Sequence, residues 1–217
     1  MSNPDVFIPM LERLAKRQII NTIIDVGASD GRWSKMARLV WPNANLLMIE
    51  ANIAHVPGMI KNFPYSPREK IVWGLAGQRL GCERVKFNKE DPFQGADPSE
   101  DGEWLPIVTI EQEISLTDFK PPYLIKLDCH GREYDILESV GTFMPSVAAV
   151  VAEVYTVSLG PRSMSFIPLA SHMRESYLLT PTDLCDPMVR PFDGRLSQID
   201  VLFEKTTAPG MDIGGYK

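Results

Sequence analysis

Cysteine is scarce in this chain, and long apolar runs are absent. The three cysteines are far apart and odd in number, so they fit a reducing cytoplasm better than a disulfide framework. No run of about 18 apolar residues occurs that would predict a membrane span, and no signal-type apolar segment stands at the start. We therefore expect a cytoplasmic protein that does not cross a membrane.

Positive charge is also in short supply. The 217 residues carry 22 Lys and Arg against 28 Asp and Glu, a formal net charge of −6, which argues against a nucleic-acid partner. A hydrophobic content of 44% and the chain length suit one α/β domain. We predict an N-terminal helix within 1–20, a domain over 21–205 and a frayed tail over 206–217.

The most informative stretch runs from Asn21 to Glu50. It reads as a strand (Thr22–Val26), a turn bracketed by Gly27 and Gly31, a helix, and a second strand that ends at Glu50. Glycine lets a backbone approach a ligand closely, and the free N–H groups of a helix start face the same spot. An acidic residue at the end of the second strand can accept the hydroxyl hydrogens of a ribose. The stretch predicts a nucleoside-cofactor site, although an ordinary strand–turn–helix would share much of this pattern.

One glycine of the dinucleotide-binding pattern is missing from the turn. Ser29 stands where that pattern requires the glycine that admits a pyrophosphate. Asp30 would repel a diphosphate, and no Lys or Arg precedes it in the turn. A cofactor with a ribose, no phosphate and a positive centre near Asp25 and Asp30 fits better. S-adenosylmethionine has that description, and NAD-dependent oxidoreduction is correspondingly weakened.

Three segments of the chain resemble the signature segments of FkbM-type S-adenosylmethionine-dependent methyltransferases. They are DVGASDGRWS from Asp25, IEAN over 49–52, and YLIKLDCHGREYDIL over 123–137. The family usually has D-x-G-A-N-x-G, E-P-N and K-x-D-x-E-G-x-E, and the order and spacing match across roughly 20–205.

The chain departs from that family pattern at three positions. Ser29 replaces the usual Asn, Ala51 the usual Pro, and His130 the usual Glu. The last change falls beside the expected reaction site.

The resemblance implies the fold, the cofactor and its contacts. The implied fold is a Rossmann-like class I methyltransferase, with a mostly parallel seven-stranded sheet, an antiparallel edge and helices on both faces. The implied cofactor is S-adenosylmethionine, with its adenine near the 74–80 loop. The cofactor-binding residues that follow are Asp25, Gly27, Ala28, Ser29, Gly31, Glu50, Ala51, Ala76 and Asp128.

Local patterns predict the remaining elements. Helices are expected over 6–18, 54–63 (broken at Pro57-Gly58), 111–118, 132–140 and 166–176. Further strands are expected over 69–75, 81–89, 107–110, 123–128, 147–154, 177–180 and 198–204. The acidic segment 90–103 reads as a loop, either a lid at the acceptor site or a solvated insertion, and 183–197 as a loop that joins the last two strands.

Ionisable residues follow the expected strands at their carboxyl ends, where open α/β sheets bind ligands. Methyl transfer needs two aligned partners and, for a hydroxyl acceptor, removal of a proton. His130 is the candidate base because imidazole titrates near neutrality. Asp128 would orient it, position the acceptor or contact the methionine amino group, and Glu153 is a second candidate base.

Other roles for these residues are weaker. His130 could be a plain polar residue, and Asp128, His130 and Glu153 match no recognised metal motif, so no metal is expected. Cys129 and His130 are adjacent on an extended chain, which points their side chains apart and argues against a thiolate pair. Lys126, inside a buried strand, is expected to snorkel or to pair with a carboxylate.

Two functions remain open at this stage. One is O-methylation of a hydroxyl on a small molecule or glycan. The other is a catalytically weak cofactor-binding module that acts through a partner, which the His130 departure suggests. The identity of the acceptor and the oligomeric state are not written in the sequence.

Overall fold

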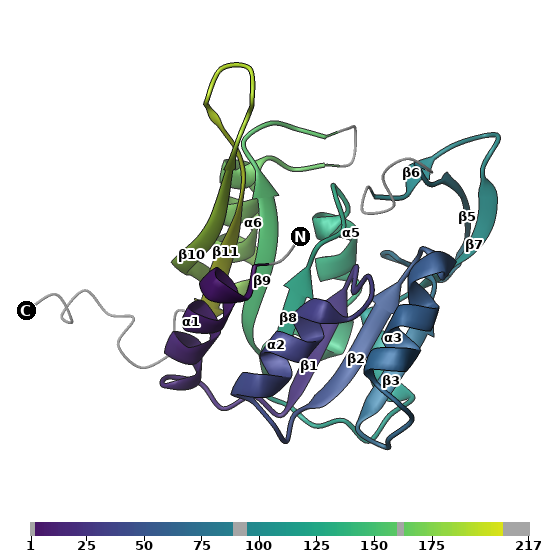
Figure 1. The fold of residues 1–217 in the computed structure, drawn as a ribbon, viewed down its shortest axis with the longest axis vertical. Coiled ribbons are helices and arrows are strands. Elements are labelled where there is room, and N and C mark those ends of the chain that lie inside the picture. The colour runs from purple at the N-terminus through teal and green to yellow at the C-terminus, as the bar shows by residue number, and fades with distance from the viewer. Residues whose placement is uncertain (1–2, 89–94, 160–162, 206–217) are drawn as a thin grey trace, which may run out of the picture.

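The computed structural model describes residues 3–88, 95–159 and 163–205. Its main feature is a seven-stranded sheet (Figure 1). The strands are β1 (Thr22–Val26), β2 (Asn45–Glu50), β3 (Glu69–Trp73), β8 (Tyr123–Leu127), β9 (Val147–Tyr155), β10 (Leu179–Val189) and β11 (Leu196–Lys205). The helices are α1 (Pro4–Ala15), α2 (Arg32–Val40), α3 (Val56–Asn62), α4 (Ile110–Ser115), α5 (Glu133–Glu138) and α6 (Phe166–Tyr177), with 3-10 turns η1 (Ile53–His55) and η2 (Gly141–Ser146).

The strand order is β10-β11-β9-β8-β1-β2-β3. The pairs from β3 to β9 are parallel, whereas β11 runs antiparallel to both β9 and β10. The central strands β1 and β8 are buried at every position, as parallel strands covered on both faces must be. The predicted sheet and its antiparallel edge are confirmed.

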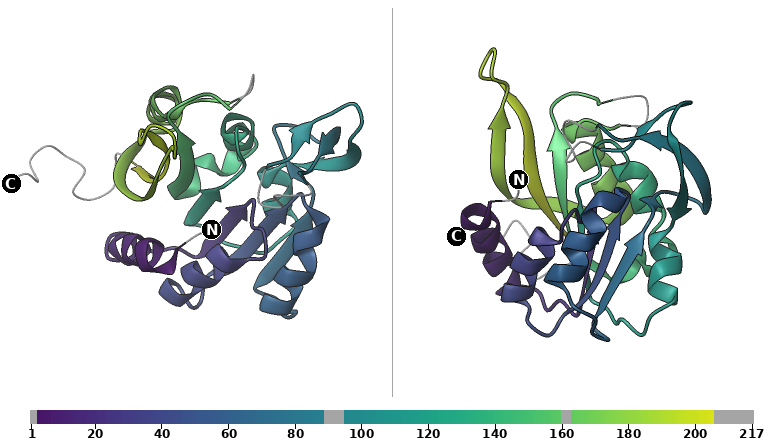
Figure 2. Two further views of the ribbon diagram at one scale, coloured as in Figure 1. Left: turned by 45° about the horizontal axis from the view of Figure 1, so that its top comes forward. Right: turned by 45° about the vertical axis from the view of Figure 1, so that its right-hand side comes forward.

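Two hydrophobic clusters cover the two faces of the sheet. Along β1, Ile24 and Val26 pack with residues of α4, α5 and α6, whereas Ile23 packs with residues of α1, α2 and α3 (Figure 2). This follows from the alternation of side chains along a strand. The helices therefore lie on both faces, as expected.

Helix α1 packs on the sheet through one apolar face. Asn3 caps it by accepting the Asp5 N–H at 3.0 Å, and Pro4 occupies its first turn. The predicted buried face is confirmed, because each of its members is at most 1% exposed, and full burial stabilises the folded state by about 1.5–3 kcal/mol per side chain. These members are Phe7, Met10, Leu11 and Leu14.

A second, smaller sheet follows β3 and was not expected from the sequence. It has the order β4-β7-β5-β6, from β4 (Leu75–Ala76), β5 (Gly81–Lys86), β6 (Asp97–Pro98) and β7 (Glu103–Val108). The prediction of one strand over 69–75 was wrong, because the chain leaves the large sheet at Gly74. The prediction of a loop over 90–103 was wrong where β6 forms and where β7 begins. Residues 89–94 of that segment lie outside the described residues.

Two further expectations were wrong. The predicted loop over 183–197 is mostly a hairpin, because β10 continues to Val189. Register shifts in its pairing with β11, and a positive φ of 51° at Asp186, allow the strand to accommodate its prolines. That hairpin projects beyond the large sheet (Figure 1). Pro57 does not break α3, because it lies in the first turn, where no N–H is needed.

The predicted tail, 206–217, lies outside the described residues. Among the helices that are described, none is long and apolar enough to span a membrane.

Candidate active site

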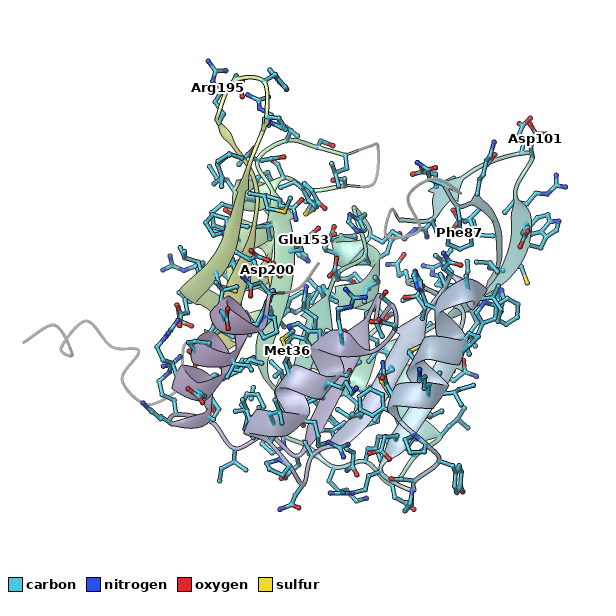
Figure 3. The ribbon with its side chains drawn as sticks, in the orientation of Figure 1. Met36, Phe87, Asp101, Glu153, Arg195 and Asp200 are labelled. Carbon is cyan, nitrogen blue, oxygen red and sulfur yellow. The ribbon has the colours of Figure 1, made fainter. Side chains whose placement is uncertain are left out.

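A cavity of about 340 Å³ opens at the carboxyl ends of β1, β2, β8 and β9. This volume lies within the range of small-molecule sites, about 300–1,000 Å³. Figure 3 shows Glu153 and Asp200 on the β9–β11 side and Phe87, which follows β5, on the small-sheet side. The cavity is lined by every site residue predicted from the sequence except Gly31.

The turn after β1 is shaped by residues with positive φ. Gly27 has a φ of 76°, and a Cβ there would lie 1.9 Å from the main-chain oxygen of Asp128. The glycine is therefore required by the close approach of β1 and β8, whether or not a ligand is bound. Gly31, with a φ of 82°, lies beneath the ring of Phe63, where a Cβ would be 2.7 Å from Cε2. Its place is in the packing behind the turn.

Glu50 ties the turn after β1 to the turn after β2. Its Oε2 accepts the Ser29 N–H at 2.7 Å, and its Oε1 accepts the Asn52 N–H at 2.6 Å. Burial raises the pKa of this carboxyl, although the two backbone donors oppose the shift. An ionised carboxylate has about four acceptor positions, so each oxygen retains one for a ligand hydroxyl.

Asp25 lies at the floor of the cavity and is 1% exposed. The Ser34 hydroxyl on α2 donates to its Oδ2 at 2.6 Å. Burial is the main reason that the pKa of Asp25 rises to about 6, and nearby carboxylates add to the rise, while Ser34 and Lys126 oppose it.

Lys126 is the buried cation of the site. Its side chain is 1% exposed, and Nζ lies 3.0 Å from Asp200 Oδ1 and 3.4 Å from Asp128 Oδ2. Desolvation lowers the pKa of this ammonium, but Asp128, Asp200 and Glu153 together raise it well above its ordinary value. The expectation that Lys126 pairs with a carboxylate is confirmed.

His130 lines the cavity and has a positive φ of 49°. Its Nδ1 lies 2.7 Å from the Tyr155 hydroxyl, which also bonds to Oε1 of Glu153. Oε2 of Glu153 accepts from Gln198 Nε2 at 2.9 Å. His130 Nε2 lies 3.6 Å from Asp128 Oδ1, which is too long for a hydrogen bond.

Three groups of this site could also approach a metal ion. Ligand-capable atoms of Asp128, His130 and Glu153 lie within 4.8 Å of one another. In the described structure, Asp128 Oδ2 lies near Lys126, His130 Nδ1 contacts Tyr155, and the two oxygens of Glu153 contact Tyr155 and Gln198.

The partly buried Cys129 thiol lies 3.8 Å from Glu133, and desolvation raises its pKa well above the ordinary value. Since the thiolate is the nucleophile, this cysteine is unsuited to nucleophilic catalysis.

Sequence reasoning missed three residues that complete the site: Tyr155, Gln198 and Asp200. Tyr155 follows Glu153 by two positions on β9, so both point to the same side of the sheet. Asp200 is opposite Glu153 in the ladder between β9 and β11. The sequence signal for Asp200 was its charge inside the otherwise largely apolar strand β11, because a buried charge requires a partner.

Comparison with known proteins places the fold. No family model and no curated protein matches the chain. Among solved structures, the FkbM methyltransferase of Methylobacillus flagellatus KT matches at a TM-score of 0.56 with 15% identity, over 84% of this chain and 43% of that one. A putative O-methyltransferase of Klebsiella pneumoniae matches at a TM-score of 0.50 with 14% identity, over 92% of this chain and 78% of that one.

The chain has the fold of a class I methyltransferase. The predicted fold class is confirmed, and so, at the level of the fold, is the resemblance to FkbM-type proteins. The chain spans less than half the length of the FkbM structure that it matches, 43% of that chain.

Proposed function

We propose that this protein transfers a methyl group from S-adenosylmethionine to a hydroxyl group of a small molecule or glycan. The observation that carries the proposal is the cavity itself. Its lining includes residues of all three expected signature segments, among them Glu50, the 27–29 turn and His130.

The charge of the cavity favours a cationic ligand. Asp25, Glu50, Glu153 and Asp200 each have a raised pKa, with burial as the first cause and neighbouring carboxylates as a further one. A positive group placed among them would oppose both effects. A sulfonium and an ammonium group supply such charge.

The cavity is less suited to a phosphate-bearing cofactor. The guanidinium groups that line it already bind carboxylates, Arg32 to Asp30 at 2.8 Å and Arg132 to Glu83 at 2.8 Å. Polar atoms without a partner also lie in its wall, since the buried indole N–H of Trp33 and the hydroxyl of Ser29 have none among the described residues. Such atoms favour a polar ligand nearby.

Each group of residues has a role in this proposal. Glu50 would accept the ribose hydroxyls, and Asp25 and Asp128 would face the ammonium group. Leu75 and Ala76 would form an apolar wall for the adenine ring. The bound cofactor supplies an electrophilic methyl group, and His130 would take the proton from the acceptor hydroxyl.

Titration calorimetry tests the cofactor. S-adenosylhomocysteine should bind the wild-type protein, NAD should not, and Glu50→Gln should weaken the first titration. Equal or preferential binding of NAD would contradict the proposal.

A methyl-transfer screen against sugar, lipid, peptide and small-molecule hydroxyls, with radiolabelled cofactor, tests the activity. His130→Gln serves as the control for enzymatic transfer. Binding of S-adenosylhomocysteine with no transfer to any class would favour the alternative, a cofactor-binding module that acts through a partner.

A further inference from the structure

The Tyr155 hydroxyl lies between the two residues that compete for the role of base. It is 2.7 Å from Nδ1 of His130 and bonds to Oε1 of Glu153. Tyr155 is 8% exposed and extends from the end of β9, so its position is fixed by the sheet. Its hydroxyl carries one proton to share between these neighbours.

The chemistry of the acceptors decides where that proton points. An ionised carboxylate can only accept hydrogen bonds, so Tyr155 must donate to Glu153. The hydroxyl oxygen must then accept from His130, which requires the proton of the neutral imidazole to sit on Nδ1. The second ring nitrogen, Nε2, is left with its lone pair.

Glu153 is held as an acceptor on both of its oxygens. Gln198 Nε2 donates to Oε2 at 2.9 Å, and Tyr155 donates to Oε1. The Glu153 side chain is 12% exposed, against 30% for His130. Glu153 is therefore poorly placed to take a proton from an acceptor in the cavity.

We propose that Tyr155 and Glu153 form a positioning pair that fixes His130 in the Nδ1–H tautomer and presents Nε2 as the base. The catalytic part of this inference rests on the proposed function. The proton leaves the acceptor oxygen for Nε2 as that oxygen's electron pair forms the new bond to carbon, and sulfur keeps the pair from the bond that breaks. The imidazolium formed in this way faces Asp128 Oδ1, 3.6 Å from Nε2.

The chain contains a second Tyr–Glu–His set that works as an internal control. The Tyr177 hydroxyl bonds to Glu138 and lies 3.3 Å from Nε2 of His172. The Ser176 hydroxyl lies 3.2 Å from Nδ1 of the same ring. The same reasoning requires Tyr177 to accept from His172, so His172 takes the opposite tautomer, Nε2–H.

Nitrogen NMR of the ligand-free, histidine-labelled protein tests the tautomers directly. The chain has three histidines, so His130→Gln and His172→Gln assign the relevant signals by their loss. At a pH where both rings are neutral, His130 should be protonated at Nδ1 and His172 at Nε2. An Nε2–H tautomer at His130 would overturn the inference.

Glu153→Gln supplies the sharper test. A glutamine amide can donate to Tyr155, which then becomes free to donate to Nδ1 of His130. The protonated nitrogen of His130 should therefore shift from Nδ1 to Nε2, while His172 stays unchanged. In Glu138→Gln, the protonated nitrogen of His172 should shift from Nε2 to Nδ1, while His130 stays unchanged. An unchanged His130 tautomer in Glu153→Gln would overturn the role of the pair.

Tyr155→Phe tests the tyrosine itself. It removes the hydroxyl that connects His130 Nδ1 to Glu153 Oε1, which are 3.6 Å apart. Both tautomers of His130 should then become populated. A single Nδ1–H tautomer in this variant would show that the carboxylate acts without Tyr155, against the inference.

Turnover provides the functional readout. Tyr155→Phe and Glu153→Gln should each lose part of the about 10²–10⁴-fold contribution of a general base. Tyr155→Phe, which keeps every carboxylate of the cavity, should leave S-adenosylhomocysteine affinity unchanged. Glu138→Gln should keep full turnover. The NMR result needs neither cofactor nor acceptor, so failure of the proposed methyl transfer and failure of this inference are separate outcomes.

Discussion

The ammonium nitrogen of Lys126 lies 3.0 Å from Oδ1 of Asp200, and the two residues belong to strands separated by β9. The pair joins the central strand β8 to the antiparallel edge of the sheet. Because Nζ is also 3.4 Å from Asp128 Oδ2, the same cation holds a carboxylate of the candidate site. Strand β11 and the site are thus connected through one buried charge.

Removal of the buried cation should destabilise the protein strongly. Lys126→Met leaves Asp200, which is 4% exposed, without a counter-charge, and we expect a loss of about 3–5 kcal/mol in the free energy of unfolding. Lys126→Met/Asp200→Leu should recover most of it, because an apolar pair needs no counter-charge. Urea denaturation measures both.

The exposed pair of Arg190 and Asp193, 2.6 Å apart on the hairpin, is the control. Asp193→Asn should change the free energy of unfolding by less than about 1 kcal/mol. If Lys126→Met lowered the free energy of unfolding by no more than Asp193→Asn does, the proposed role of the buried pair would be contradicted.

Asp25 should make the ligand-free protein less stable as pH rises. Its pKa is raised from 3.8 to about 6 in the folded state, so the folded state binds this proton more tightly. The stabilising contribution is complete below about pH 4 and is lost as pH rises through 6, a change of about 3 kcal/mol.

Asp25→Asn removes that dependence. The variant should unfold at a higher urea concentration than wild type at pH 7.5 and at a similar one near pH 4, and it should bind S-adenosylhomocysteine more weakly because a charge facing the ligand is gone. The opposite order of stability at pH 7.5 would show that the buried carboxylate is not destabilising.

Glu50 should contribute more to cofactor binding than to folding. Glu50→Gln keeps the size of the side chain but replaces one carboxylate oxygen with an NH₂ group. That NH₂ group would face a backbone N–H that now donates to Glu50, either that of Ser29 (2.7 Å from Oε2) or that of Asn52 (2.6 Å from Oε1). Loss of hydrogen bonds to a charged acceptor costs about 1.5–3 kcal/mol, so affinity for S-adenosylhomocysteine should fall about tenfold or more. Thermal unfolding without ligand separates the two effects, since an unchanged dissociation constant with a lowered midpoint would make Glu50 a structural residue only.

Gly27 should be intolerant of any side chain for a reason internal to the protein. A Cβ would meet the Asp128 main-chain oxygen at 1.9 Å, and φ is 76°. Gly27→Ala should therefore lower the unfolding midpoint in the absence of cofactor. Gly194, with a φ of 69° and no atom within 4 Å of a Cβ, is the matched control for backbone strain alone. Similar midpoints for Gly27→Ala and Gly194→Ala would contradict the steric explanation.

The elements that the sequence predicted well are those decided by local pattern. The bounds of β1 match the prediction, because Thr22–Val26 is a short apolar run enriched in β-branched residues and ends at a glycine. The helix α1 was found from its cap and its apolar stripe. Both signals lie within one segment.

The rest depended on contacts between distant segments. Lys126 acquires its partner from Asp200, 74 residues later, and no local pattern names that partner. The hairpin was not predicted, because its extended form depends on pairing with β11 across bulges and not on a local pattern. The choice between His130 and Glu153 could not be made from the sequence, since it depends on the hydroxyl of Tyr155 between them.

The last prediction concerns which residue removes the proton of the acceptor. If His130 is the base, His130→Gln should reduce turnover by a factor of about 10² to 10⁴, because glutamine can hydrogen-bond but cannot take up a proton at neutral pH. Affinity for S-adenosylhomocysteine should stay within a factor of about two. The rate of wild type should fall at acidic pH as the imidazole is protonated, and this limb of the profile should disappear in the variant.

His172→Gln serves as the control, since His172 lies on α6 in the other tyrosine network and should keep both the rate and the profile. If Glu153 were the base, Glu153→Gln would abolish turnover while His130→Gln retained the acidic limb. The geometry favours His130, because both oxygens of Glu153 already accept hydrogen bonds, from Tyr155 and from Gln198. A His130→Gln enzyme with the rate and pH profile of wild type would exclude the histidine as the base.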